Sequence, residues 1–462
     1  MKPTTHTTSN VANSPAPAGE ASRASAPGHA PADASSAPAS APASAPASAP
    51  ASAPASAVLP CLLDIGELML IAGADVSLVE RTLDRMGHAY GARKMHAFVI
   101  TAVIMVTMTN PDGTEVTLTR RIDTKGDTNF GKLEKLNRLA EECCAHPVPK
   151  DELSRRTSAI AREPFPRRAL YAGGVLAAGS FAMFFGGTLL DGVVSAAFAV
   201  LICWLMEHLK PLSPNNIVFN FAAALVAGLG IGMTARVVPG VSVDMVMIGD
   251  IMLLIPGIAM TNAARDMLAG DTVTGVMRLV ESLLWAMALA LGFMAALWLT
   301  DVSALSAAVR DTGPLADAII QLVVSLPASA GFALLFNLRG PLVIPASIGG
   351  VLSWGIYLAC GQVIEGIFFP CLVASAFSAV FAELLARHYR APGALFFIIA
   401  VIPLVPGRGL FYTMDAAMRA DWAAFSDFAL LTLQFALAIA VGISVVWAVR
   451  EVMRRLEEAR RA

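Results

Sequence analysis

From residue 169 onward, long apolar stretches separated by short polar joints dominate the chain. Helical stretches of about 20 apolar residues match the hydrocarbon thickness of a bilayer. The pattern therefore predicts ten transmembrane helices, at 169–189, 192–209, 216–237, 245–260, 276–299, 318–338, 342–359, 364–386, 393–411 and 425–449. The fourth and the ninth are short, and each contains a Pro-Gly pair.

The segment before the first predicted span has shorter periodic runs. Helical spacing predicts helices within 59–90, broken near Gly73 and capped by Asp75 or Ser77, and again over 129–144 and 151–162. Residues 97–108 are apolar and β-branched but too few to span a bilayer, so we expect one buried strand. A second strand follows the turn at 110–113, as in a hairpin.

Domain boundaries follow from these patterns. Residues 1–57 are rich in Ala, Pro and Ser and predict a disordered tail, because recurring proline blocks helix formation. Residues 58–165 are expected to form a cytoplasmic α+β domain. The membrane part then divides into 166–300 and 316–450, and a basic cytoplasmic tail follows at 451–462.

The two membrane segments look like repeats of one another. Residues 254–257 (LIPG) align with 404–407 (LVPG) at an offset of 150 residues, and the predicted spans follow with the same offset. Each repeat holds five spans, so the second must enter the membrane from the opposite side. The expected fold is an all-α polytopic membrane protein of two inverted five-helix repeats, an architecture typical of secondary transporters.

Lysine and arginine indicate the orientation of the spans. Basic residues gather at the ends predicted to lie inside, whereas the outside loops hold Arg236, Arg310, Arg408 and Arg419. Basic residues are enriched on the cytoplasmic side of membrane proteins. We therefore expect a multi-pass protein of a bacterial inner membrane with both termini in the cytoplasm.

The two Pro-Gly pairs are the sharpest local signal. Proline removes a backbone donor and clashes with the preceding turn, and freed carbonyls in a bilayer must be covered by protein or water. Pro256-Gly257 and Pro406-Gly407 therefore predict half-helices whose ends meet near the middle of the membrane and hold a charged ligand. Two structural kinks are the alternative.

Ionisable residues within the predicted spans are further candidates. Asp250 precedes Pro256 in an otherwise apolar helix, where a carboxylate costs at least about 2.5 kcal/mol on insertion scales. We expect it to face a cavity and to carry a proton. Glu281, Glu365 and Glu383 are further candidates that lie nearer to predicted helix ends, and Glu365 and Asp244 could simply reach water.

Asparagine and arginine side chains could recognise a substrate. Asn262 and Arg265 are three residues apart, so they can share a helix face and bind a carboxylate. In the alternative, Arg265 anchors an ordinary cytoplasmic helix end and pairs with Asp266. Asn216 and Asn220 are one turn apart and could line a polar path.

The composition excludes several other classes of protein. Hydrophobic residues make up 56% of the chain and charged residues 15%, against about 25% charged in soluble domains. The six cysteines lack metal-binding spacing, and we find no nucleophile elbow or phosphate-binding loop. We therefore expect no enzyme, no metal, no cofactor and no nucleic-acid partner.

Two segments resemble a known family, the threonine/serine exporters. Residues 63–67 (LDIGE) with 73–80 (GADVSLVE) are similar to the family's opening helices, and 253–266 is similar to its first transmembrane signature. The second repeat resembles the smaller companion subunit of split members. The resemblance covers about 58–450, which corresponds to the fused form.

The resemblance implies efflux of L-threonine and L-serine from the cytoplasm, driven by the proton-motive force. Its partners would be an amino acid or dicarboxylate substrate, protons, the lipid bilayer and, in a homo-oligomer, copies of itself. Split members are linked to succinate-type dicarboxylate export, which stays an alternative with Arg408 as a second cation. A membrane-anchored enzyme or sensor acting through 58–165 is the third hypothesis.

Overall fold

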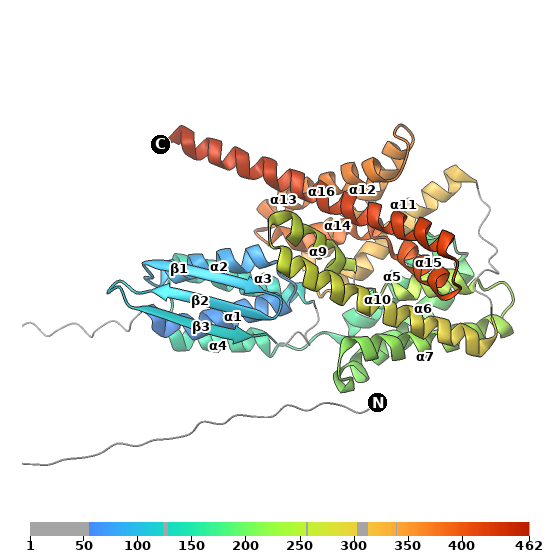
Figure 1. Cartoon of the computed structure of the whole chain (residues 1–462), viewed down its shortest axis with the longest axis horizontal. Coiled ribbons are helices and arrows are strands. Elements are labelled where there is room, and N and C mark those ends of the chain that lie inside the picture. The colour runs from blue at the N-terminus through green and yellow to red at the C-terminus, as the bar shows by residue number, and fades with distance from the viewer. Residues whose placement is uncertain (1–54, 123–127, 256, 303–312, 339, 462) are drawn as a thin grey trace, which may run out of the picture. The chain divides into compact units, whose positions relative to one another are not determined.

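The structure is a computed structural model that describes residues 55–122, 128–255, 257–302, 313–338 and 340–461 (Figure 1). Nearly all of the tail expected at 1–57 lies outside these residues. The described part of the chain is helical apart from one three-stranded sheet.

The elements that contain and surround this sheet are here called the N-terminal domain. In chain order they are a 3-10 turn Ala55–Val58, α1 Leu59–Ile71, α2 Val76–Ala89, β1 Lys94–Ile100, β2 Val103–Thr109, β3 Glu115–Arg121, α3 Phe130–Ala145 and α4 Lys150–Ala161. The break between α1 and α2 falls where the sequence predicts it, because Gly73 has a φ of +101° and Asp75 accepts a hydrogen bond from the Leu78 amide at 2.8 Å.

The sheet corrects one prediction. Residues 97–108 do not form a single strand, because β1 and β2 are two antiparallel strands that pair Ile100 with Val103. The turn at Thr101 lacks Gly, Pro, Asn and Asp, so the sequence shows no turn signal there. The hairpin predicted at 110–113 is present, and it pairs Thr109 of β2 with Glu115 of β3.

One face of the sheet forms the core of the domain. Val99 of β1 and Ile104, Val106 and Met108 of β2 are buried, and α1 and α2 pack on this face (Figure 1). Alternate residues such as Phe98 are exposed on the other face. This is the alternation expected of an antiparallel sheet with one covered face.

The remaining helices form an apolar bundle. They are α5 Arg167–Phe184, α6 Leu189–His208, α7 Asn216–Val237, α8 Val243–Ile251, α9 Gly257–Ala269, α10 Thr272–Thr300, α11 Pro314–Leu335, α12 Val343–Gly361, α13 Phe368–Tyr389, α14 Gly393–Val401, α15 Gly407–Met418 and α16 Trp422–Arg461. Short 3-10 turns occur at Lys210–Leu212, Gly340–Leu342 and Ile402–Leu404. Helix α16 runs without a break through most of the tail expected at 451–462.

Among the described residues, seven helices are long and apolar enough to cross a membrane, or eight if one bent pair is counted as a span. These are fewer than the ten predicted. The 18-residue α5 begins with two arginines, and the predicted span 245–260 is divided into α8 and α9, of nine and 13 residues. A division of this kind shortens each apolar run below the thickness of a bilayer.

The two halves of the bundle have matching elements. Helices α8, α9 and α10 begin at 243, 257 and 272, and α14, α15 and α16 begin 150 residues later, at 393, 407 and 422. Helix α7 packs on α10 as α13 packs on α16. The halves also interlock, because α9 packs on α16, α15 on α10, and α5 on α11.

Helix α10 approaches α7 closely enough to yield a test of this packing. A Cβ at Gly292 would lie 2.5 Å from the carbonyl oxygen of Phe221, whereas a Cβ at Gly361, near the end of α12, would meet nothing within 4 Å. We predict that Gly292→Ala costs about 1–3 kcal/mol through overpacking, and that Gly361→Ala stabilises by about 0.5–1 kcal/mol. The melting temperature of the purified protein in detergent measures both, and shifts of the same sign would contradict the packing.

Candidate functional site

The interruptions in the two halves of the bundle lie against each other. Helix α8 ends at Ile251 and α9 begins at Gly257, while α14 and its 3-10 turn end at Leu404 and α15 begins at Gly407 with a bend of 52°. A Cβ at Gly407 would collide with the sulfur of Met252. The first interruption therefore touches the start of α15, and a larger residue at 407 would require the Met252 side chain to move.

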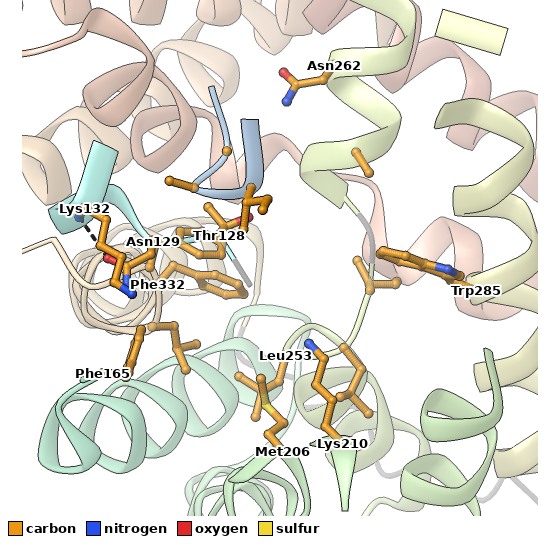
Figure 2. A pocket seen from close by; sticks show the side chains of 18 of the residues that line it. Thr128, Asn129, Lys132, Phe165, Met206, Lys210, Leu253, Asn262, Trp285 and Phe332 are labelled. Atoms are coloured by element: carbon orange, nitrogen blue, oxygen red, sulfur yellow. Dashed lines mark hydrogen bonds between the residues drawn. The ribbon is translucent and has the colours of Figure 1, made fainter. Parts of the chain in front are cut away.

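A cavity of about 690 Å³ lies beside these interruptions. Leu254, Ile255 and Asn262 line it from the first half, and Ile402 and Val405 line it from the second. Figure 2 shows Asn262 at this cavity. The N-terminal domain and other bundle helices contribute further lining residues, including Ala72, Gly73, Thr128, Asn129, Lys132, Phe165, Met206, Trp285, Leu335 and Phe336. Its volume falls within the range of about 300–1,000 Å³ that is typical of small-molecule sites.

Charged side chains of both signs line this cavity. The cations are Lys132, Arg167, Lys210 and Arg278, and the anions are Glu207 and Glu281. Arg167 forms an ion pair with Glu207, and Arg278 forms one with the buried Asp266 at 3.2 Å. The lining therefore carries a net excess of cations, partly held in place by ion pairs.

Some of the candidates from the sequence lie at the cavity. Asn262 lines it, is 9% exposed and directs its side chain toward the open space (Figure 2). Gly257 begins α9, and Arg265 belongs to the same helix. Pro256 and the side chain of Arg265 lie outside the described residues.

Three residues of α10 complete this side of the cavity. Arg278, Glu281 and Trp285 all line it, at spacings of three and four residues. Such spacing places side chains on one face of a helix. Of these three residues, sequence reasoning singled out Glu281 alone. It counted Arg278 only among the basic residues at the inside ends of spans, and it did not consider Trp285. A sequence pattern could have identified these residues: polar side chains at spacings of three and four residues within an otherwise apolar helix.

Asp250, which was expected to face a cavity, is fully buried and does not line this one. Its Oδ1 accepts a hydrogen bond from the Ser195 hydroxyl of α6 at 3.1 Å, and its Oδ2 has no hydrogen-bond partner among the described residues. Helix α8 packs between α5 and α6, so this turn of α8 faces those helices.

A second polar contact joins α8 to α15. The buried Asp244 accepts a hydrogen bond from the Tyr412 hydroxyl at 3.2 Å. The guanidinium of Arg408 lies 5.5 Å from the centre of the Tyr412 ring and donates a hydrogen bond to the Phe185 carbonyl at 3.4 Å. None of these residues lines the cavity, and the exposed Arg408 instead contacts Phe185 of the first half.

The remaining candidates also lie elsewhere. Glu383 forms ion pairs with Arg387 at 3.1 Å and Arg450 at 2.6 Å near the end of α13. Asn216 is the first residue of α7, and Asn220 is buried one turn later. Neither asparagine lines the cavity, because α7 packs on α6, α8 and α10 instead of on the interruptions that enclose it.

Two interrupted helices beside a cavity with charged side chains in its lining, within a bundle of apolar helices, are typical of membrane transporters. The chain belongs to the threonine/serine exporter family, because one family model of that description matches residues 61–300 and a second matches 321–449. The protein is therefore a multi-pass membrane exporter of this type. No solved structure matches the chain.

The curated relatives are named after two kinds of substrate. The "Threonine/serine exporter" of Corynebacterium glutamicum is 20% identical over 77% of this chain and 74% of its own length. The "Probable succinate transporter subunit YjjP" of Escherichia coli is 28% identical over 50% of this chain and 90% of its own, and the Klebsiella aerogenes protein of the same name is 25% identical over 50% and 88%.

The Asp244–Tyr412 contact predicts coupled stabilities. Tyr412→Phe removes the donor from a buried carboxylate, which costs about 1–3 kcal/mol. In an Asp244→Ala background the carboxylate is absent, so we expect the same change to cost much less. A double-mutant cycle measured by unfolding in detergent gives the coupling energy. Strictly additive effects would show that the two side chains do not interact.

Proposed function

We propose that the protein exports L-threonine and L-serine through the cavity between its interrupted helices. The observation that carries this proposal is a lining that offers a cation, a carboxylate and an amide on neighbouring helices. An amino acid is a zwitterion, so it needs an anionic and a cationic partner in the same site. The Corynebacterium relative, named a threonine/serine exporter, supports this assignment.

The geometry of α9 and α10 suits such a ligand. Arg278 and Glu281 are three residues apart on α10, so their head groups can reach the α-carboxylate and the α-ammonium of one molecule. Asn262 on α9 can donate to the carboxylate or bind the side-chain hydroxyl. Trp285, one turn beyond Glu281, can cover the apolar part of the substrate.

For the membrane arrangement we propose ten spans in two inverted repeats, α5–α10 and α11–α16. Each repeat has five spans if the interrupted pairs α8–α9 and α14–α15 count as one span each. Both termini and the N-terminal domain then lie in the cytoplasm of a bacterium. The cavity faces that side, and the Asp244–Tyr412 contact closes the opposite half of the membrane.

Asp250 is our candidate for coupling export to protons. It is fully buried, it receives one hydrogen bond from Ser195, and it lies on the helix that leads to the first interruption. Burying a charge without a partner is costly, so binding and release of a proton would change how α8 packs. Such a change at the interruption could be transmitted to the cavity.

One observation favours a second candidate substrate. The lining has four cations and two anions, and a dicarboxylate needs two cationic or donor groups. Arg278 and one of the two lysines, Lys132 or Lys210, are the pair we would assign; Arg408 lies away from the cavity. The relatives named as succinate transporter subunits agree with this alternative.

Efflux from preloaded cells tests the proposal directly. Cells or vesicles are loaded separately with labelled threonine, serine or succinate, and loss of label is followed with and without an uncoupler. We expect uncoupler-sensitive loss of threonine and serine. Loss of succinate alone would replace the amino acids by a dicarboxylate, and no loss of any of the three would contradict export through this cavity.

If Asn262 binds the substrate, its replacement should change the KM for efflux, whereas replacement of Asn216 should not. We expect Asn262→Ala to raise the KM for efflux about tenfold or more, because a hydrogen bond to a charged group contributes about 1.5–3 kcal/mol. Asn216→Ala serves as the matched control and should leave KM unchanged, since that residue lies outside the cavity. Equal effects of both changes would remove Asn262 from the site.

The role proposed for Asp250 predicts a loss of coupling. Asp250→Asn keeps the size of the side chain but cannot bind and release a proton, so we expect efflux that no longer depends on pH or on the uncoupler. The control is Asp301→Asn, because that side chain is 99% exposed. Unchanged pH dependence in Asp250→Asn would place the coupling group elsewhere.

A further inference from the structure

The N-terminal domain is joined to the bundle by specific contacts at the start of α3. The amide of Asn337, just after α11, donates a buried hydrogen bond to the Asn129 side chain at 2.8 Å. The backbone amide of Phe130 donates to the Phe336 carbonyl at 2.7 Å, and the two phenylalanine rings lie 5.3 Å apart.

The backbone of both parts comes close together at this junction. Asn337 ends α11 in the left-handed conformation, with a φ of +58° that asparagine readily adopts, and the Leu338 amide donates to the Ala333 carbonyl at 2.8 Å. On the other side, a Cβ at Gly131 would lie 2.8 Å from the Asn337 carbonyl oxygen. One continuous hydrophobic cluster also contains buried residues of both parts, such as Phe130 and Phe332.

This junction places part of the N-terminal domain in the wall of the cavity. Thr128, Asn129 and Lys132 line it from the start of α3, as Figure 2 shows, and the segment 70–74 lines it from the end of α1. The Lys132 ammonium donates to the Ala161 carbonyl at 2.7 Å. An ammonium has three donors, so this hydrogen bond leaves others for a ligand.

We propose that the N-terminal domain forms part of the substrate-binding site, with Lys132 binding a carboxylate of the transported metabolite. This inference rests on the proposed function, and it applies to amino acids and dicarboxylates alike because both carry a carboxylate. Asn262 and Arg278 contact the same ligand from the bundle side. The substrate is thus held between the domain and the interrupted helices.

Binding across this junction links ligand occupancy to the position of the domain. A ligand that contacts both parts stabilises the docked arrangement, and docking in turn strengthens ligand binding by the same factor. Release on the other side of the membrane then requires the contacts at Lys132 to be lost. The domain is in this way part of the transport cycle itself.

Cysteine labelling in the full-length protein tests the inference. Cys144 and Cys360, the two partly exposed native thiols, are replaced by serine, and the four buried cysteines stay. Thr128→Cys reports on the domain side of the cavity and Ala259→Cys on the α9 side. Lys135→Cys is the control, because Lys135 lies one turn from Lys132 but pairs with Glu163 at the surface. Maleimide labelling is timed with threonine, serine, succinate or 1,2-propanediol, which lacks a carboxylate.

At saturating ligand we expect labelling to slow by at least about fivefold at Thr128→Cys and Ala259→Cys and to stay unchanged at Lys135→Cys, since most sites are then occupied. The ligand among threonine, serine and succinate that slows labelling identifies the substrate. 1,2-Propanediol should not slow labelling at any position. Protection at Ala259→Cys alone would overturn the inference and leave the proposed function standing. Protection at neither position by any of the three carboxylates would overturn both.

The same assay tests Lys132 itself. In the Thr128→Cys background, Lys132→Gln should raise the half-protecting ligand concentration about tenfold, the value expected for loss of a charge-assisted hydrogen bond. Lys135→Gln is the matched control and should have no effect. A purely structural role of Lys132 would lower the yield of folded protein at an unchanged half-protecting concentration, and that result would contradict binding by Lys132.

Discussion

The architecture depends on one constraint, which is that backbone polar groups within a bilayer must be paired or covered. An interrupted helix exposes such groups, so it survives only where protein or a water-filled cavity meets it. In this protein the two interruptions cover each other, with Met252 against Gly407, and a cavity lies beside them. The contact between the two interruptions therefore joins the two halves of the bundle and lies beside the cavity that the N-terminal domain also lines.

The charges around the cavity are arranged by the same geometry. Arg278 forms an ion pair with the buried Asp266, and Arg167 forms one with Glu207. These ion pairs hold the two arginine side chains in position before a ligand binds. Charges fixed in a poorly hydrated site interact more strongly than they would in water. The cavity lining offers a cation, a carboxylate and an amide, which is the combination that the proposed zwitterionic substrate needs. Its excess of cations agrees with the alternative substrate, a dicarboxylate.

Sequence reasoning succeeded where the signal is local and failed where it depends on which helix face meets which neighbour. The Pro-Gly pairs predicted both interruptions, and Asn262, a candidate from the sequence, lines the cavity beside them. Asp250 was expected to face a cavity; it accepts a hydrogen bond from Ser195 of α6 and does not line the cavity described above. Arg408 follows its Pro-Gly pair directly, yet it packs on Tyr412.

By itself, the sequence determined the membrane-spanning character, the repeat at an offset of 150 residues, the helix breaks and the family, because apolar run length, proline and glycine act within a few residues of their own position. The tertiary structure alone decided that β1 and β2 are separate strands, that Arg278, Glu281 and Trp285 form one wall, and that the N-terminal domain, joined to the bundle by the Asn129–Asn337 hydrogen bond, lines the cavity. These arrangements join residues up to 208 positions apart, and no local pattern records which distant surfaces fit together.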